Sequence, residues 1–284
     1  DGTNEQLTSE SRTSFSGPQT RTRYSEYDHN AIGYNALATM GGQLGSTEHV
    51  ISVGVDYSED TYETMRTGAT FNAAGVSLPE YSAFPTRDFP TTDITETGVF
   101  LQDEISLLDG KLRITPAFRY DEYDAKVSPD VVWVAGHTNE ALPEEFSDSD
   151  TTASISAVYK LSDAVRVYAR YGQGFRAPPA NAVNAGFQNL RGGYKVISNA
   201  DLQSETSTGA EVGLRFSGDG IYLDATVFQN DYEDFIEENV IAPAFLASGG
   251  VDPSDGLLAF TSVNRGEVSI SGFELSGEMS LSYV

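Results

Sequence analysis

The chain has 284 residues, 39% of them hydrophobic, and a formal net charge of −25 from 42 acidic and 17 basic residues. This acidity argues against binding to a nucleic-acid backbone, which needs a basic surface, and the absence of cysteine excludes disulfides and thiolate metal sites. No segment approaches 18 consecutive apolar residues, so we expect no transmembrane helix. Most of the acids are expected in solvated loops, with divalent-cation binding as the alternative.

Segments with strictly alternating apolar and polar residues recur along the chain and predict β-strands. The first two cover residues 32–40 and 51–58, and a short glycine-rich link at 41–48 joins them. A long connection, roughly 67–94, precedes a strand that opens at Val99. A tight turn at 108–110 leads from it to the strand 111–121, and a long acidic link, about 125–150, follows.

The second half of the chain repeats this order. Strands at 155–161 and 165–171 flank a tight turn at 162–164, and a connection of about thirty residues then extends to Glu205. The strand 207–216 and the turn 217–220 precede a strand that runs from Ile221 to about Glu238. A loop with two prolines separates it from the last strand, roughly 260–275.

The lengths of these connections indicate the kind of sheet. Four short links alternate with four long ones, as in outer-membrane barrels, which have short turns at one rim and long loops at the other. Many strands have the roughly 9–11 residues that a tilted strand needs to cross a bilayer. We therefore predict an all-β chain that forms a partial antiparallel transmembrane β-barrel of about nine or ten strands. Because no signal peptide precedes Asp1 and the sequence stops within a strand pattern at Val284, we interpret it as an internal fragment.

The alternation also assigns side chains to the two faces of the wall. An arginine on a lipid face costs about 2–4 kcal/mol near the midplane, so the basic side chains should face the lumen. We expect the following residues to point outward: Leu112, Ile114, Phe118, Val167, Val212 and Leu214. The inward set is Arg113, Arg119, Arg166, Arg170 and Arg215. Tyr57, Tyr120 and Tyr171 lie toward the long-loop ends, where an interfacial aromatic girdle is expected.

A series of short motifs resembles the C-terminal half of the TonB-dependent outer-membrane receptors. The segment Gly174-Phe175-Arg176-Ala177-Pro178 is followed by Asn199-Ala200-Asp201-Leu202-Gln203-Ser204-Glu205-Thr206, where Ala200 and Gln203-Ser204 depart from the family's Pro and Lys-Pro. Gln102-Asp103-Glu104, Phe118-Arg119-Tyr120-Asp121, the segment 230–236 and Ser271-Gly272-Phe273-Glu274 extend the resemblance over roughly residues 95–275.

The resemblance implies a fold, a location and partners. It implies that residues 1–284 are a piece of a barrel of probably 22 strands, without the plug domain. It implies a Gram-negative outer membrane, contact with its lipid, and a periplasmic TonB protein that acts through the missing N-terminal part. Such a receptor takes up an iron-bearing ligand, is not an enzyme and has no intrinsic cofactor.

A narrower resemblance points to the haem and haemoglobin receptor branch. It rests on the segment 183–190, on Gly192-Gly193-Tyr194, and on the Phe-Pro pairs at 84–85 and 89–90. It implies haem or haemoglobin as the ligand. The resulting ligand-binding candidates are Phe175, Arg176, Asn184, Phe187, Tyr194 and His137. No histidine lies within residues 177–198, so Tyr194 and His137 are the iron-ligand candidates of this chain, and a metal site is not assigned.

Three alternatives stay open. The missing loop histidine favours a ferric siderophore as the ligand within the same transport class. An adhesin built on an outer-membrane barrel is a binding-class alternative. An outer-membrane hydrolase is disfavoured, because the sequence contains no Gly-x-Ser-x-Gly motif and no histidine near a credible nucleophile. His29 and His49 are interpreted as incidental.

Overall fold

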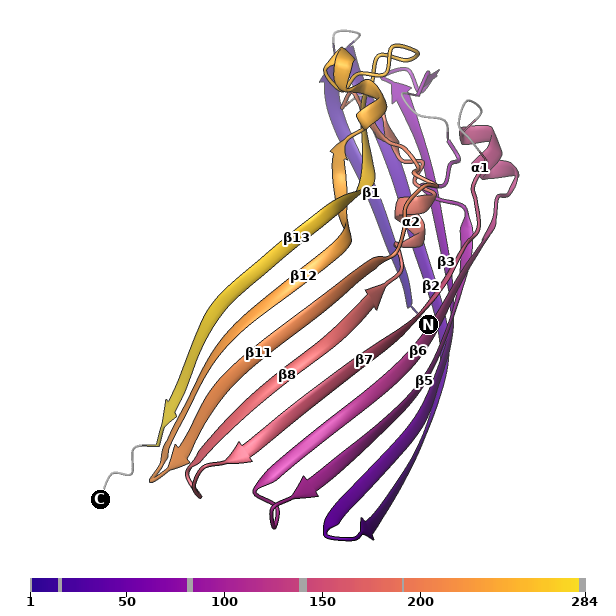
Figure 1. Cartoon of the computed structure of the whole chain (residues 1–284). Coiled ribbons are helices and arrows are strands. Elements are labelled where there is room, and N and C mark those ends of the chain that lie inside the picture. The colour runs from indigo at the N-terminus through magenta and orange to yellow at the C-terminus, as the bar shows by residue number, and fades with distance from the viewer. Residues whose placement is uncertain (1, 15–16, 81–83, 138–141, 191, 281–284) are drawn as a thin grey trace.

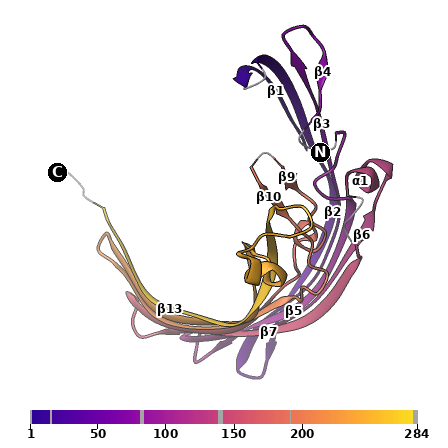
Figure 2. The same ribbon diagram turned by 90° about the horizontal axis from the view of Figure 1, so that it is seen from above.

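The computed structural model describes residues 2–14, 17–80, 84–137, 142–190 and 192–280. Ten long strands in this part of the chain form one continuous antiparallel meander. They are β1 (Gly2–Ser14), β2 (Gly17–Leu44), β3 (Thr47–Asn72), β5 (Thr91–Leu107), β6 (Leu112–Ser128), β7 (Phe146–Lys160), β8 (Val165–Arg176), β11 (Glu205–Gly218), β12 (Ile221–Ile241) and β13 (Leu258–Met279). The sheet curves into an open wall, the shape of part of a barrel (Figures 1 and 2). The predicted fold class is thereby confirmed.

Small elements lie in the long connections. They are the strands β4 (Ser77–Leu78), β9 (Gln188–Asn189) and β10 (Tyr194–Val196), the helices α1 (Val131–Gly136) and α2 (Ala180–Val183), and the 3₁₀ helix η1 (Pro243–Ser248). Among the described residues, no helix has the length and apolar character needed to cross a membrane.

The four predicted short links all lie at one rim, the lower one in Figure 1. The links at 108–111 and 161–164 agree with the predicted turns to within one residue. The other two are shorter than predicted: 219–220, since Gly218 already pairs with Ile221, and 45–46, since Leu44 already pairs with Thr47. In the turn between β11 and β12, Asp219 (φ 51°) and Gly220 (φ 73°) both adopt left-handed backbone conformations. Two such residues in succession form the turn type that matches the twist of paired strands.

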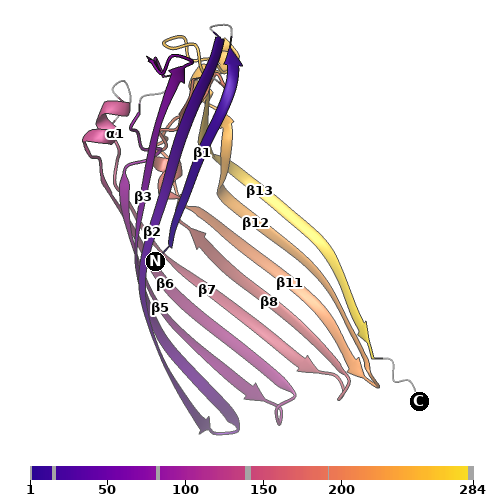
Figure 3. The ribbon, with the colours of Figure 1, turned by 180° about the vertical axis from the view of Figure 1, so that it is seen from behind.

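Several strands extend well beyond the predicted bounds. β2 has 28 residues and β3 has 26, more than twice what a bilayer crossing requires. The segment 17–31 and β1 were not predicted as strands, because they are polar on both faces and carry no apolar alternation. Their conformation is held by backbone pairing, which runs without a break from Gly17↔Ser14 to Gly2↔His29. Figure 3 shows these strands continuing upward to the level of the long connections.

The register places the two predicted sets of side chains on opposite faces, as expected. Leu112 pairs with Tyr159, which pairs with Val167, which in turn pairs with Leu214. The five arginines belong to the alternate positions of the same ladders. Arg66, which the register places on the arginine face, contacts Phe187 of the connection folded into the concave side (Figure 2). The arginine face is therefore the inner one.

The outer face carries the exposed apolar surface of the molecule. Phe118 is 57% exposed and Val212 is 52% exposed, whereas the buried apolar cluster of the described residues consists of Ala182, Val183 and Leu202. A large contiguous apolar exterior around a polar interior is the inverse of a soluble fold and is typical of a membrane barrel. Four tyrosines mark the upper edge of this apolar surface: Tyr34, Tyr57, Tyr120 and Tyr171.

Candidate functional site

The long connections gather at the rim opposite the short turns. The connection between β8 and β11 folds into the concavity, where β9 and β10 lie (Figure 2). β10 pairs in parallel with the upper end of β13, with Tyr194 opposite Leu258. The long connections are therefore not independent loops but parts of one assembly above the wall.

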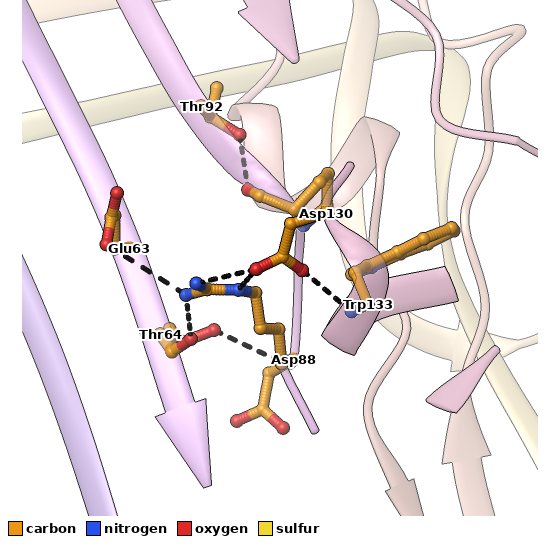
Figure 4. Close-up of polar contacts among 8 residues, drawn as sticks. Glu63, Thr64, Asp88, Thr92, Asp130 and Trp133 are labelled. Atoms are coloured by element: carbon orange, nitrogen blue, oxygen red, sulfur yellow. Dashed lines mark hydrogen bonds and ion pairs between the residues drawn. The ribbon is translucent and has the colours of Figure 1, made fainter. Parts of the chain in front are cut away.

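One ion pair joins the connection between β3 and β5 to helix α1 (Figure 4). Arg87 Nε and Nη2 lie 3.0 and 2.9 Å from Asp130 Oδ2, and Arg87 Nη1 donates to the Thr64 carbonyl oxygen at 2.6 Å. The other oxygen of Asp130 accepts the Trp133 backbone N–H at 2.8 Å and so caps α1. Burial opposes ionisation of Asp130, but the Arg87 and backbone N–H hydrogen bonds outweigh it and lower the pKa of the carboxyl.

His137 follows directly after α1 and is 5% exposed. Its Nδ1 lies 2.7 Å from the Trp133 carbonyl oxygen, and its Nε2 lies 2.7 Å from the Gly186 carbonyl oxygen. The ring also stacks on Trp133 at 4.5 Å. Both nitrogens therefore face backbone carbonyls, and His137 ties α1 to the connection between β8 and β11.

Asn184 makes a second tie between the same two connections. Its side-chain amide donates to the Glu144 carbonyl oxygen at 2.8 Å and accepts the Glu144 backbone N–H at 2.9 Å. Asn184 is 4% exposed. Through this pair of hydrogen bonds, Asn184 holds the connection between β8 and β11 against the connection between β6 and β7.

Phe187 and Tyr194 belong to an aromatic group above the inner face. Their ring centroids are 5.8 Å apart, and the Phe260 ring meets Tyr194 edge-on at 6.2 Å. The guanidinium carbon of Arg66 lies 5.0 Å from the Phe187 centroid. The group is half-buried and combines aromatic faces with a cation.

Arg176 and Phe175 end β8 and lie on opposite faces. Arg176 is paired with Glu205 at 3.3 Å and stays 52% exposed on the inner face. Phe175, opposite Thr206, belongs to the outer-face positions. Four of the six candidates thus lie in the long connections: Asn184, Phe187, Tyr194 and His137. Arg176 lies below them on the inner face. Phe175 has an outer-face position by register, although it also borders the groove described next.

A groove of about 760 Å³ lies along the inner face below these connections. Arg119 occupies it between two acids, with Nη1 2.8 Å from Asp56 Oδ2 and Nε 2.7 Å from Asp121 Oδ1. Glu96, Phe175 and Arg176 also line the groove. The groove therefore presents guanidinium groups as hydrogen-bond donors and carboxylates as acceptors to a ligand in the lumen.

An ion-pair cluster that sequence reasoning missed joins the two C-terminal connections. Lys195 Nζ lies 2.6 Å from Asp252 Oδ2 and 2.8 Å from Asp255 Oδ2. The Lys195 and Ser254 hydrogen bonds lower the pKa of Asp252 to about 2. Burial disfavours the charged form of Lys195, but the hydrogen bonds to Asp252 and Asp255 and their negative charges outweigh this effect and raise the pKa of Lys195. No sequence pattern pairs residues separated by 57 positions.

The other two histidines also lie in hydrogen-bonded pairs. His29 Nε2 is 2.7 Å from Asp60 and its ring stacks on Tyr62 at 4.4 Å, and His49 Nδ1 is 2.7 Å from Asp103. Within the described residues, no group of three or more histidine and acidic side chains has the geometry of a metal site. The acidic connections contain ion pairs and capping contacts in place of such a cluster.

Comparison with known proteins supports the architecture. The heme/hemopexin utilization protein C of Haemophilus influenzae is 26% identical over 268 residues, which is 85% of this chain and 33% of that protein. The ferric enterobactin receptor of Pseudomonas aeruginosa is 28% identical over 227 residues, 77% of this chain and 26% of that protein. The chain thus spans about a third or less of the length of these relatives.

The solved structures and the family comparison agree on the fold. The ferric citrate transporter FecA in its unliganded form superimposes with a TM-score of 0.60 at 16% identity, over 92% of this chain and 35% of that one. The family described as TonB dependent receptor-like, beta-barrel, matches residues 2–284. The chain belongs to this family of TonB-dependent receptor β-barrels.

Proposed function

We propose that this chain is part of an outer-membrane receptor that takes up an iron-bearing ligand with energy from a periplasmic TonB protein. The observation that carries the proposal is the match to the receptor family over residues 2–284. It is supported by the assembly of long connections that covers a polar groove on the inner face. A Gram-negative outer membrane is the proposed location, and no catalytic role is proposed.

Haem or haemoglobin is the preferred ligand in this proposal. The support is the resemblance of residues 183–194 to haem receptors and the similarity to the heme/hemopexin utilization protein. Phe187 and Tyr194 would offer aromatic contacts to a porphyrin face. Arg66, beside Phe187, would pair with a propionate.

A ferric siderophore is the second candidate, and one observation favours it. Both ring nitrogens of His137 face backbone carbonyls, and Tyr194 lies between two aromatic rings. Iron ligation by either residue would require these contacts to rearrange. The similarity to a ferric enterobactin receptor is in keeping with this alternative.

Growth on defined iron sources tests the proposal. A strain that lacks its own iron receptors is given the full-length receptor and supplied with haem, haemoglobin or a ferric siderophore as the only iron source. Growth on haem that requires TonB supports the preferred ligand, and growth on the siderophore alone supports the second candidate. Growth on neither source, with the receptor present in the outer membrane, contradicts iron uptake and favours the adhesin alternative.

A further inference from the structure

The last part of the connection between β8 and β11 runs alongside the upper end of β13 (Figure 2). β10 (Tyr194–Val196) pairs with β13 in parallel. Beyond β10, the Ile197 N–H donates to the Phe260 carbonyl oxygen at 2.8 Å, and the Ile197 carbonyl oxygen accepts the Thr261 hydroxyl at 3.1 Å. The contact with β13 thus continues past the paired strands toward the segment 199–206, which carries one of the sequence motifs.

Two asparagine side chains extend this contact to the end of the connection. Asn199 Nδ2 donates to the Ser262 carbonyl oxygen at 2.9 Å. Asn264 binds the backbone of Gln203 in both directions, because its Oδ1 accepts the Gln203 N–H at 2.9 Å and its Nδ2 donates to the Gln203 carbonyl oxygen at 2.9 Å. A side-chain amide is suited to this contact, since it has a donor and an acceptor side by side.

Asn264 also reaches the backbone of β12. Its Nδ2 donates to the Asp234 carbonyl oxygen at 2.7 Å. Asp234 has a left-handed backbone conformation (φ 53°) and interrupts the ladder between β12 and β13 directly after Glu233↔Glu267. This conformation is unfavourable for a residue other than glycine, and it persists where surrounding contacts hold it, often at functional sites. Asn264 is thus the contact that joins the irregular backbone at Asp234 to the connection.

The neighbouring residues of the segment are fixed as well. Glu205 Oε2 accepts the Ile236 N–H of β12 at 3.0 Å and lies 3.3 Å from the Arg176 guanidinium of β8. The Ser204 hydroxyl donates to Asp148 Oδ2 of β7 at 2.5 Å. Ser204 and Glu205 are both 8% exposed. The end of the connection is therefore attached to several strands of the wall, with Asn264 as its attachment to β13.

The ligand-binding candidates Phe187 and Tyr194 lie earlier in this same connection. The Tyr194 ring meets the Phe260 ring of β13 edge-on at 6.2 Å. The Val196 N–H donates to the Phe187 carbonyl oxygen at 2.8 Å, which ties Phe187 to β10. The positions of both aromatic rings consequently depend on how the connection is attached to β13.

We propose that Asn264 is a positioning residue for ligand capture. By joining the Asp234 carbonyl to the backbone of Gln203, it fixes the connection that carries Phe187 and Tyr194. The inference rests on the uptake function proposed above. It applies to haem and to a ferric siderophore alike, because it concerns the attachment of the connection and not the chemistry of the ligand.

Uptake kinetics of the full-length receptor test the proposal. Initial rates of radiolabelled iron uptake are measured against the concentration of haem or of a ferric siderophore. Asn264→Ala removes all three hydrogen bonds, and Asn264→Asp places a carboxylate oxygen against two carbonyl oxygens. We expect each substitution to raise the half-saturation concentration of the transported ligand about tenfold, with an unchanged maximal rate.

Hydrogen exchange of the Gln203 amide measures the positioning directly. Exchange should be faster in Asn264→Ala than in the wild type. It should stay slow in Asn264→Asp, because the remaining side-chain oxygen still accepts the Gln203 N–H. Fast exchange in neither variant would show that Asn264 does not hold the connection, and this outcome overturns the proposal.

Two variants serve as controls. Gln203→Ala keeps the backbone groups that Asn264 contacts, and Asn30 is an exposed asparagine of β2. Gln203→Ala and Asn30→Ala should therefore both transport as the wild type does. Heat-modifiable electrophoretic migration shows that each variant is folded. If the Asn264 variants do not insert, Asn199→Ala, which removes one bond of the same attachment, should raise the half-saturation concentration in their place.

An unchanged half-saturation concentration in the folded Asn264 variants overturns the proposal, as does a loss confined to the maximal rate. If only Asn199→Ala folds, an unchanged value in that variant has the same consequence. Absence of uptake by the wild type contradicts the proposed function itself. Because that result is obtained before any substitution is made, it is distinguishable from failure of the positioning role.

Discussion

Lys195 Nζ lies 2.6 Å from Asp252 Oδ2, although the two residues are 57 positions apart and belong to different connections. Asp255 and the parallel pairing of β10 with β13 strengthen the same junction. The two C-terminal connections thus form one unit above the lumen.

Replacement of Lys195 by Met should loosen this unit without unfolding the barrel. The substitution leaves Asp252 and Asp255 close together with no cation between them, so the aspartates should repel each other. We expect faster amide hydrogen exchange in residues 194–196 and 258–260, with unchanged exchange in β7. Lys111→Met, at an exposed position at the opposite rim, is the control. Unchanged exchange in Lys195→Met would show that strand pairing alone holds the junction.

The same cluster should respond to acid in a defined window. The pKa of Asp252 is lowered to about 2, below the unfolded value of about 3.9, so its contribution is present above pH 4. It is lost as the pH falls from about 4 toward 2. A spin label on Ala244→Cys should therefore become more mobile over this range, and Asp252→Asn should abolish that transition. A transition that persists in Asp252→Asn would assign it to another group.

The raised pKa of Lys195 predicts the opposite dependence at alkaline pH. Its contribution is present below the unfolded value of about 10.4 and is lost as the pH rises through the higher folded value. The label at position 244 should stay immobile up to about pH 10.4 and loosen above it. A Lys195→Arg variant should keep the label immobile at the higher pH, because arginine stays charged.

Removal of the α1 cap should expose Trp133, the single tryptophan of this sequence. Asp130→Ala removes both the cap and the Arg87 partner, and loss of a cap alone costs about 0.5–2 kcal/mol. We expect a red shift of Trp133 fluorescence, measured as the difference from the same variant with Trp133→Phe. Asp163→Ala, in a turn at the opposite rim, should show no shift.

The assignment of faces predicts a contrast between neighbouring positions of β11. Val212→Arg places a charge on the outer face and should cost about 2–4 kcal/mol near the midplane, so the folded band in outer-membrane fractions should decline. Glu211→Arg, one position away on the inner face, should insert normally. Normal insertion of Val212→Arg, or failed insertion of Glu211→Arg alone, would contradict this assignment of the outer and inner faces.

The regular part of this fold was predictable, because one physical rule covers it. Alternation fixes the face of each side chain, and the contrast between short and long links fixes the rim of each turn. The polar extensions of β2 and β3 were not predictable, since polar residues occupy both faces there and show no apolar alternation. Backbone hydrogen bonds hold the ladder together there, and the identity of residues such as Thr20 and Thr22 gives no sign of this pairing.

The ligand-binding residues stay a prediction. Phe187 and Tyr194 contact each other above the inner face, whereas Asn184 and His137 take part in contacts between connections. Ion pairs such as Lys195–Asp252 depend on how distant segments fold together. Such contacts leave no local pattern in an acidic sequence where any carboxylate is a possible partner.

Uptake by a receptor that lacks residues 180–197 tests the central claim most directly. The full-length receptor and this deletion variant are compared for transport of radiolabelled iron as haem and as a ferric siderophore, with surface display and heat-modifiable migration as measures of barrel insertion. We expect the deletion to abolish uptake of the ligand that the intact receptor transports while insertion is unchanged. Unchanged uptake by the deletion variant would contradict a role of this connection in ligand capture.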